Sequence, residues 1–200
     1  MRLAANWMKP MKPTVRELTP ERWPDLERLF GPRGACGGCW CMWWRLEKGE
    51  KWGDLRGARA KRRFKRLVLV GKAHGALAYL GKEPVGWVSF ERRTDLPRLD
   101  RAPSLRCEDA SEVWSIPCFF VRRDHQGKGV ATALLQAARA LLKRRGARLA
   151  EGYPVKLSPG GGLMPPLFAY TGTLPMFERA GFAVATARPR GKQRVRKRLA

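Results

Sequence analysis

Residues 112–146 read EVWSIPCFFVRRDHQGKGVATALLQAARALLKRRG, and this stretch decides the fold. Its first part, residues 113–121, is an apolar run rich in β-branched and aromatic side chains, which predicts a strand buried on both faces. Pro117 lies inside the run and has no N–H to give to a neighbouring strand, so we expect a bulge or a splay there. A polar turn follows, and then apolar side chains recur at helical spacing as far as Gly146.

The turn between this strand and this helix is predicted to bind an anion. The first amides of a helix have no backbone partner and point outward along the helix axis. Gly127 and Gly129 would let a ligand approach the backbone closely, and a pyrophosphate is the natural guest. The alternative is an ordinary strand-to-helix turn in which the glycines only allow the chain to turn tightly and bind no ligand. The turn lacks the glycine spacing of a P-loop and of the dinucleotide-binding fingerprint.

What the turn does contain is QGKGVA at residues 126–131, a Q-x-x-G-x-A pattern. This pattern resembles the acetyl-CoA-binding motif of the GNAT acyltransferase superfamily. A second match is LPMFERAGF at residues 174–182, which is similar to the short helix ending in Gly-Phe further along the chain in that superfamily. The resemblance spans residues 14–187. The CxxCWCMWWR stretch at residues 36–45 and EGYP at residues 151–154 also resemble one bacterial subgroup of GNAT acetyltransferases.

The resemblance implies an α/β (α+β) fold: a mixed, mostly antiparallel sheet with splayed central parallel strands, flanked by helices. It also implies an N-acetyltransferase that uses acetyl-CoA as cosubstrate and an amine as acceptor. The backbone of Phe119 and Val121 would contact the pantetheine arm. The pyrophosphate would be held by the residues of the turn, which are Gln126, Gly127, Lys128, Gly129, Val130 and Ala131.

The side chains that move protons are harder to assign. The superfamily often places an acid-acting tyrosine in the short helix, and Phe177 stands at that position here, so this role does not carry over. Tyr153 and Tyr170 are the remaining candidates for the acid, with packed core tyrosines as the alternative. We expect Glu112, at the start of the central strand, to be the general base, and Glu151 on the adjacent strand is second. For both, the alternative is a solvated carboxylate at a strand end.

Composition adds a second functional hypothesis. The chain has 41 lysines and arginines against 17 acidic residues, a net charge of +24. Such an excess attracts polyanions such as RNA. The alternative function is therefore a non-catalytic or weakly catalytic GNAT-fold protein that binds nucleic acid or another polyanion through its basic surface. A basic surface with no partner but counterions is equally compatible with the charge.

The five cysteines are an odd number, which suits a reducing cytoplasm better than a set of disulfides. Three of them fall within residues 36–41 and could hold zinc with Cys107 or Cys118 as a fourth ligand. No second C-x-x-C or histidine pair follows, so we predict no metal. We expect instead a tryptophan-rich loop, which the resemblance to the GNAT superfamily implies would border the acceptor site, with tryptophans packed into the core as the alternative.

Length and the absence of any linker predict one domain over residues 1–200. Residues 1–13 would be a loose basic leader, residues 188–200 a basic C-terminal strand and tail, and residues 155–172 a flap over the acceptor side. No segment approaches the roughly 18 apolar residues that a membrane span needs. The oligomeric state stays open, with a dimer among the options. Further helices are predicted at residues 20–30 and 55–67, and further strands at residues 14–18, 76–80, 85–90, 148–153, 182–187 and 194–199.

Overall fold

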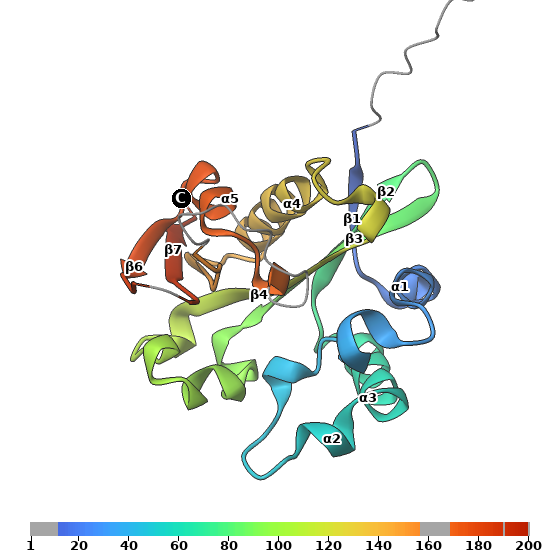
Figure 1. Cartoon of the computed structure of the whole chain (residues 1–200), viewed down its shortest axis with the longest axis horizontal. Coiled ribbons are helices and arrows are strands. Elements are labelled where there is room, and N and C mark those ends of the chain that lie inside the picture. Colours follow the sequence, from blue (N-terminus) through green and yellow to red (C-terminus); the bar gives the residue numbers. More distant parts are fainter. Residues whose placement is uncertain (1–11, 157–168, 190, 200) are drawn as a thin grey trace, which may run out of the picture.

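The apolar run forms β4 (Val113–Val121), the central strand of a seven-stranded sheet (Figure 1). The structure is a computed structural model and describes residues 12–156, 169–189 and 191–199. The strand order is β1-β2-β3-β4-β5-β7-β6. The remaining strands are β1 (Thr14–Glu17), β2 (Gly75–Leu80), β3 (Glu83–Arg92), β5 (Leu149–Gly152), β6 (Ala183–Thr186) and β7 (Arg194–Arg198).

The pairing of β4 differs on its two sides. Among the described strands, β4 and β5 run parallel, and every other neighbouring pair is antiparallel. The parallel ladder ends at Ile116 and Gly152. On the other side, residues 89 to 91 of β3 oppose residues 118 to 115 of β4, so β4 holds one extra residue near Pro117. The predicted bulge, the end of parallel pairing and the mixed α/β fold are confirmed.

Helices cover both faces of the sheet (Figure 1). The long helix α4 (Val130–Arg144) and the short α5 (Leu174–Arg179) pack on one face, and α1 (Trp23–Phe30) and α3 (Ala58–Leu69) pack on the other. Strand β2 shows why both faces are buried, since its side chains alternate between the two cores. Ala76 and Ala78 contribute to the core beneath α4, whereas Leu77 and Tyr79 contribute to the core beneath α1 and α3.

A third, smaller core joins two irregular segments. The segment between β3 and β4, residues 93–112, is a succession of short 3-10 turns rather than a regular element. Its Leu96, Leu99 and Leu105 pack with Trp44 and Tyr153. This small core therefore holds the 93–112 segment against the loop that contains the cysteines and against the end of β5.

One predicted helix boundary was wrong, and two predicted segments lie mostly outside the described residues. The helix predicted at residues 55–67 begins at Ala58, because Gly57 adopts a left-handed φ of 73° and separates it from a four-residue helix, α2 (Trp52–Leu55). Most of the predicted leader and flap lies in residues 1–11 and 157–168, outside the described residues. Within the described part, no helix is both long enough and apolar enough to cross a membrane.

The position of α4 depends on a glycine in β3. A Cβ atom placed on Gly86 would lie 2.7 Å from Val130 Cγ1 and 3.0 Å from Leu134 Cδ1. Both distances are shorter than ordinary van der Waals contact, so any side chain at this position would push the first turn of α4 away from the sheet.

We therefore expect Gly86→Ala to lower the free energy of unfolding by about 1–3 kcal/mol, the usual cost of overpacking a core. Urea titration followed by circular dichroism measures this. Gly53→Ala is the matched control, because a Cβ there meets nothing within 4 Å and the residue lies in a helix, where alanine is favoured. A Gly86→Ala variant as stable as the wild type would show that α4 does not need this close approach.

Candidate active site

The turn between β4 and α4 has the geometry expected of an anion site. Gly127 and Gly129 adopt left-handed φ angles of 72° and 78°, and a Cβ on either would meet nothing within 4 Å. The Gly129 carbonyl accepts the amide of Ala133 at 3.0 Å, so α4 starts immediately after Gly129. The first amides of α4 consequently have no carbonyl partner within the helix, and the exposed turn leaves them open to a ligand.

Two side chains fix this turn to the sheet. Gln126, the first residue of the Q-x-x-G-x-A pattern, donates from Nε2 to the Val121 carbonyl at 3.1 Å. On the other side, Arg122 pairs with Asp124 through two contacts of 2.5 and 3.1 Å and also contacts Glu83 in β3. The turn therefore has a defined position relative to the end of β4.

A cavity of about 980 Å³ runs from this turn along the end of β4 to the cysteine loop. Its size is at the upper end of the range usual for small-molecule sites. The turn and the start of α4 contribute residues 125–127 and 129–132, and β4 contributes residues 118–121. The opposite wall includes Cys36, Cys39, Cys41, Trp43, Tyr170, Gly172, Thr173, Met176, Arg179 and Lys192.

The middle of this cavity is the place where β4 and β5 separate. After Ile116, none of the described strands pairs with the β5 side of β4. The Pro117 carbonyl there accepts a hydrogen bond from Trp44 Nε1 at 3.2 Å. A short 3-10 turn, Ala169–Thr171, lies alongside β4 and places Tyr170 in the cavity wall. Backbone groups beyond the bulge are thus available to an extended ligand.

The structure does not bring the three predicted catalytic residues into this cavity. Glu112 is exposed at the start of β4, six residues before Cys118, which is roughly 20 Å along a strand. Glu151 and Tyr153 are fully buried, and neither lines the cavity. Their assignment to proton transfer stays a prediction, and from these positions any proton would have to travel through water or other side chains.

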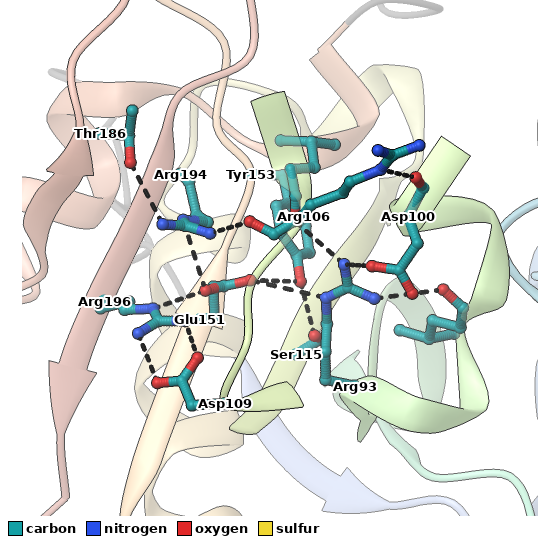
Figure 2. Close-up of polar contacts among 12 residues, drawn as sticks. Arg93, Asp100, Arg106, Asp109, Ser115, Glu151, Tyr153, Thr186, Arg194 and Arg196 are labelled. Atoms are coloured by element: carbon teal, nitrogen blue, oxygen red, sulfur yellow. Dashed lines mark hydrogen bonds and ion pairs between the residues drawn. The ribbon is translucent and has the colours of Figure 1, made fainter. Parts of the chain in front are cut away.

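Figure 2 shows what Glu151 and Tyr153 do contact. Glu151 accepts hydrogen bonds from Arg196 Nε at 2.6 Å and from the Tyr153 hydroxyl at 2.8 Å. Arg93 approaches the same carboxylate at 3.8 Å, and Ser115 Oγ lies 2.6 Å from the Tyr153 hydroxyl. Burial, and secondarily the charge of Glu151, raises the pKa of Tyr153 well above its usual range. The cluster joins β4, β5, β7 and the 93–112 segment.

The cysteine loop supplies much of the opposite wall. All five cysteines are free, and Trp87 Nε1 lies 3.0 Å from Cys41 Sγ. In the described part of the chain, no group of three or more His, Cys, Asp or Glu side chains is arranged to hold a metal ion. Trp40 and Trp44 pack into cores, whereas Trp43 lines the cavity. The tryptophans of the loop thus divide between core packing and the cavity wall, and a border with the acceptor stays a prediction.

Sequence reasoning missed Arg179 and Lys192 as cavity residues and did not place Tyr170. They come from separate segments that meet only in the folded chain. No local motif surrounds Tyr170 or Lys192, and Arg179 lies within the LPMFERAGF match but looks there like an ordinary surface residue of a short helix. A pattern search along the chain therefore had no signal to find.

The cavity environment predicts slow alkylation of its thiols. Burial, and secondarily the negative charge that Cys41 would carry, raises the pKa of Cys39 to about 12. A raised pKa means less thiolate at a given pH, and the thiolate is the form that reacts. We expect iodoacetamide at pH 8 to modify Cys39 at least ~100-fold more slowly in the folded protein than in the urea-unfolded chain. Peptide mass spectrometry measures both rates, and equal rates would contradict the burial of this thiol.

A mixed sheet with a splayed parallel pair, a glycine turn and a cavity between them defines the class of acyl-CoA-dependent acyltransferases. The model of the acetyltransferase (GNAT) family matches residues 39–151, which is more than half of the chain. The protein therefore belongs to the GNAT acetyltransferase family.

Solved structures agree with this fold. An acetyltransferase from Thermus thermophilus has a TM-score of 0.53 at 18% identity, covering 96% of this chain and 100% of its own. The protein yncA of Salmonella typhimurium, solved with its cofactor acetyl-CoA, has a TM-score of 0.55 at 14% identity, covering 94% of both chains. The GNAT domain of PAT from S. lividans has a TM-score of 0.53 at 19% identity, covering 94% of this chain and 90% of that one.

At such identities the solved structures establish the fold alone. No curated protein sequence matches the chain. The comparisons offer nothing in favour of the polyanion-binding alternative, and the cytoplasmic location stays a prediction.

Proposed function

We propose that this protein transfers the acetyl group of acetyl-CoA to the nitrogen of an amine. The observation that carries the proposal is that the glycine turn and the open side of β4 line one continuous cavity. One end of the cavity suits a pyrophosphate, and the middle suits an extended arm. The yncA structure, a protein of similar fold solved with acetyl-CoA, supports the same cosubstrate here.

The residues present fit acetyl-CoA. The two left-handed glycines leave open space above the backbone, and the amides that begin α4 are directed into it. In the proposal, residues 126–131 hold the pyrophosphate, with Lys128 adding a positive charge from its exposed position. Phe119 and Val121 offer backbone groups on the open side of β4, as a strand would to a neighbour.

Acetyl-CoA supplies a thioester whose carbonyl carbon is attacked by the amine nitrogen, with loss of the thiolate and of one amine proton. The protein holds the two reactants together, which removes much of the entropic barrier. A β4 amide beyond Pro117 would donate to the developing oxyanion. The same cavity wall contains apolar and aromatic side chains, which exclude water from the reacting atoms.

For the proton donor to the thiolate, the positions favour Tyr170 over Tyr153. Tyr170 lines the cavity beside the open end of β4, whereas Tyr153 is fully buried behind Trp44. Burial raises the pKa of Tyr170, so its hydroxyl keeps its proton across the physiological range. Tyr153 then has a positioning role: with Glu151 it holds the end of β5, where the two strands separate.

Glu112 and Glu151 are the proposed general bases, and both lie outside the cavity lining. In the described part, no aspartate or glutamate lines the cavity. Glu112 and Glu151 can act only through intervening water, because neither side chain reaches it. Deprotonation of the amine by solvent is the competing route.

Two further parts of the proposal concern organisation. The whole chain, residues 1–200, would form one GNAT domain, with the terminal segments as extensions of it. The CxxCWCMWWR stretch would mark a subgroup in which the cysteine loop forms the acceptor wall, since Cys36, Cys39 and Trp43 line the cavity.

The first experiment tests the cosubstrate site. Gly129→Asp introduces bulk and a negative charge where the pyrophosphate would lie, so we expect acetyl-CoA affinity to fall on the order of 100-fold or more. Calorimetry with acetyl-CoA measures it. Gly71→Asp is the matched control, because Gly71 is also left-handed with open space around it but does not line the cavity. A folded Gly129→Asp variant with wild-type affinity would refute the site.

The second experiment tests the acid. Tyr170→Phe should lower kcat about 100-fold, the contribution usual for a general acid, with acetyl-CoA affinity unchanged. Tyr153→Phe should reduce thermal stability, because Glu151 loses a buried donor, and should change kcat much less. Thiol release from acetyl-CoA and thermal unfolding separate the two effects. If Tyr153→Phe alone reduced kcat at full stability, the roles would be reversed.

A further inference from the structure

A second cavity, of about 420 Å³, adjoins the first and shares three lining residues with it: Trp43, Tyr170 and Lys192. Its other walls come from the 93–112 segment, the cysteine loop and the residues after β6. Because Tyr170 borders both cavities, a molecule could occupy the second cavity and still extend to the open end of β4. The second cavity therefore lies where an acceptor would enter.

Four cationic residues line this second cavity, and their side chains are held in place. Arg98 stacks on Trp43, with Cζ 3.7 Å from the ring centroid, and Lys192 Nζ lies 5.2 Å from that of Tyr170. Arg188 donates from Nη1 to Ser104 Oγ at 2.9 Å. The fourth, Arg101, donates from Nη2 to the Leu46 carbonyl at 2.9 Å. Ring faces, a hydroxyl and a carbonyl thus orient the four cations.

None of these four forms an ion pair within the described residues. The carboxylate that Arg101 does influence is Glu50, which pairs with Arg63. The contrast with the adjacent cluster in Figure 2 is direct, because there Arg93 and Arg196 are matched by carboxylates. Many other lysines and arginines in the described part of this basic chain also lack an ion pair, but these four line one cavity together.

The charge balance of the two cavities selects the kind of molecule they accept. No aspartate or glutamate lines either cavity in the described part of the chain. Burial, followed by the charge of Arg101, lowers the pKa of Arg98, and burial lowers that of Lys192, so these cations are short of compensating charge. A polycationic amine would be repelled here, whereas an oxyanion would satisfy several donors at once.

We propose that the acceptor is an amine that also carries an oxyanion, a carboxylate or a phosphate, which binds Arg98, Arg101, Arg188 and Lys192. The oxyanion would occupy the second cavity, and the amine would lie on the Tyr170 side, next to the open end of β4. The inference rests on the proposed acetyl transfer and adds the substrate class to it. Arginine forks suit both oxyanions, so the experiment includes one amine of each kind.

The experiment compares matched amines that differ in the anionic group. The pairs are O-phosphoethanolamine with ethanolamine, and L-phenylalanine with L-phenylalaninamide, at one fixed ionic strength because salt screens charge. Thiol release from acetyl-CoA gives kcat/KM, and calorimetry gives affinity without any need for turnover. We expect at least one anionic amine to exceed its neutral or cationic partner by about 10-fold or more in both measurements.

Two arginine variants make the comparison specific to the cavity. Arg98→Gln should reduce the preference for the anionic amine about 10-fold, because one donor to the oxyanion is lost. The two amines of a pair differ in pKa, but that difference cancels when the same pair is compared in the wild type and the variant. Arg92→Gln is the matched control: Arg92 also stacks on a tryptophan, Trp114, but lines neither cavity. It removes the same net charge, so an equal effect in both variants would indicate a long-range field and overturn the proposal.

The outcomes separate this inference from the proposed function. Acetyl transfer with a preference for ethanolamine and phenylalaninamide would overturn the oxyanion site and leave the N-acetyltransferase proposal intact. Binding of an anionic amine that depends on Arg98, with no affinity for acetyl-CoA, would support the site and overturn acetyl transfer. If neither anionic amine binds at millimolar concentration, the oxyanion proposal is wrong.

Discussion

The central constraint in this fold is that β4 and β5 pair in parallel for four residues and then stop pairing. The ladder runs from Val113 and Leu149 to Ile116 and Gly152. Pro117 follows immediately and has no N–H to donate to a neighbouring strand. At the same place β4 holds one residue more than β3 does, and such a bulge bends a strand. Backbone polar groups inside a protein require partners. The unpaired stretch persists because Trp44 satisfies one carbonyl and because the cavity keeps the rest accessible to a ligand.

The elements that line the cavity are held by contacts made on either side of this separation. Gly86 lets α4 approach β3, and Gln126 secures the turn to the last residue of β4. On the β5 side, Phe177 packs directly against Gly152 and makes edge-to-face contacts with Phe119 and Phe182. A residue at that position is therefore core, which is the physical reason why the tyrosine expected there by resemblance is replaced by phenylalanine without loss of packing.

The fold and the cosubstrate end of the site could be predicted from sequence because their signals are local. The apolar run with its Pro117 and the glycine turn are adjacent in the sequence. The residue types of each restrict the backbone conformations available there. The proposed acceptor end could not be predicted, since Tyr170, Arg98 and Lys192 come from three segments without a motif. Sequence also placed Glu112 near the chemistry because it opens the central strand. The structure shows instead that the two ends of that strand lie far apart.

Composition gives the number of basic residues, whereas the structure shows which of them pair with buried carboxylates. Two carboxylates, Glu91 and Glu151, are fully buried and hold segments that line the two cavities. Glu91 pairs with Arg45, just after the tryptophans of the cysteine loop, and with His74, while Glu151 pairs with Arg196 and lies near Arg93. An unpaired buried charge is costly, so these carboxylates determine which arginines belong to the framework. The cations that line the second cavity have no such carboxylate in the described part of the chain, which is why we propose that an oxyanion from outside pairs with them.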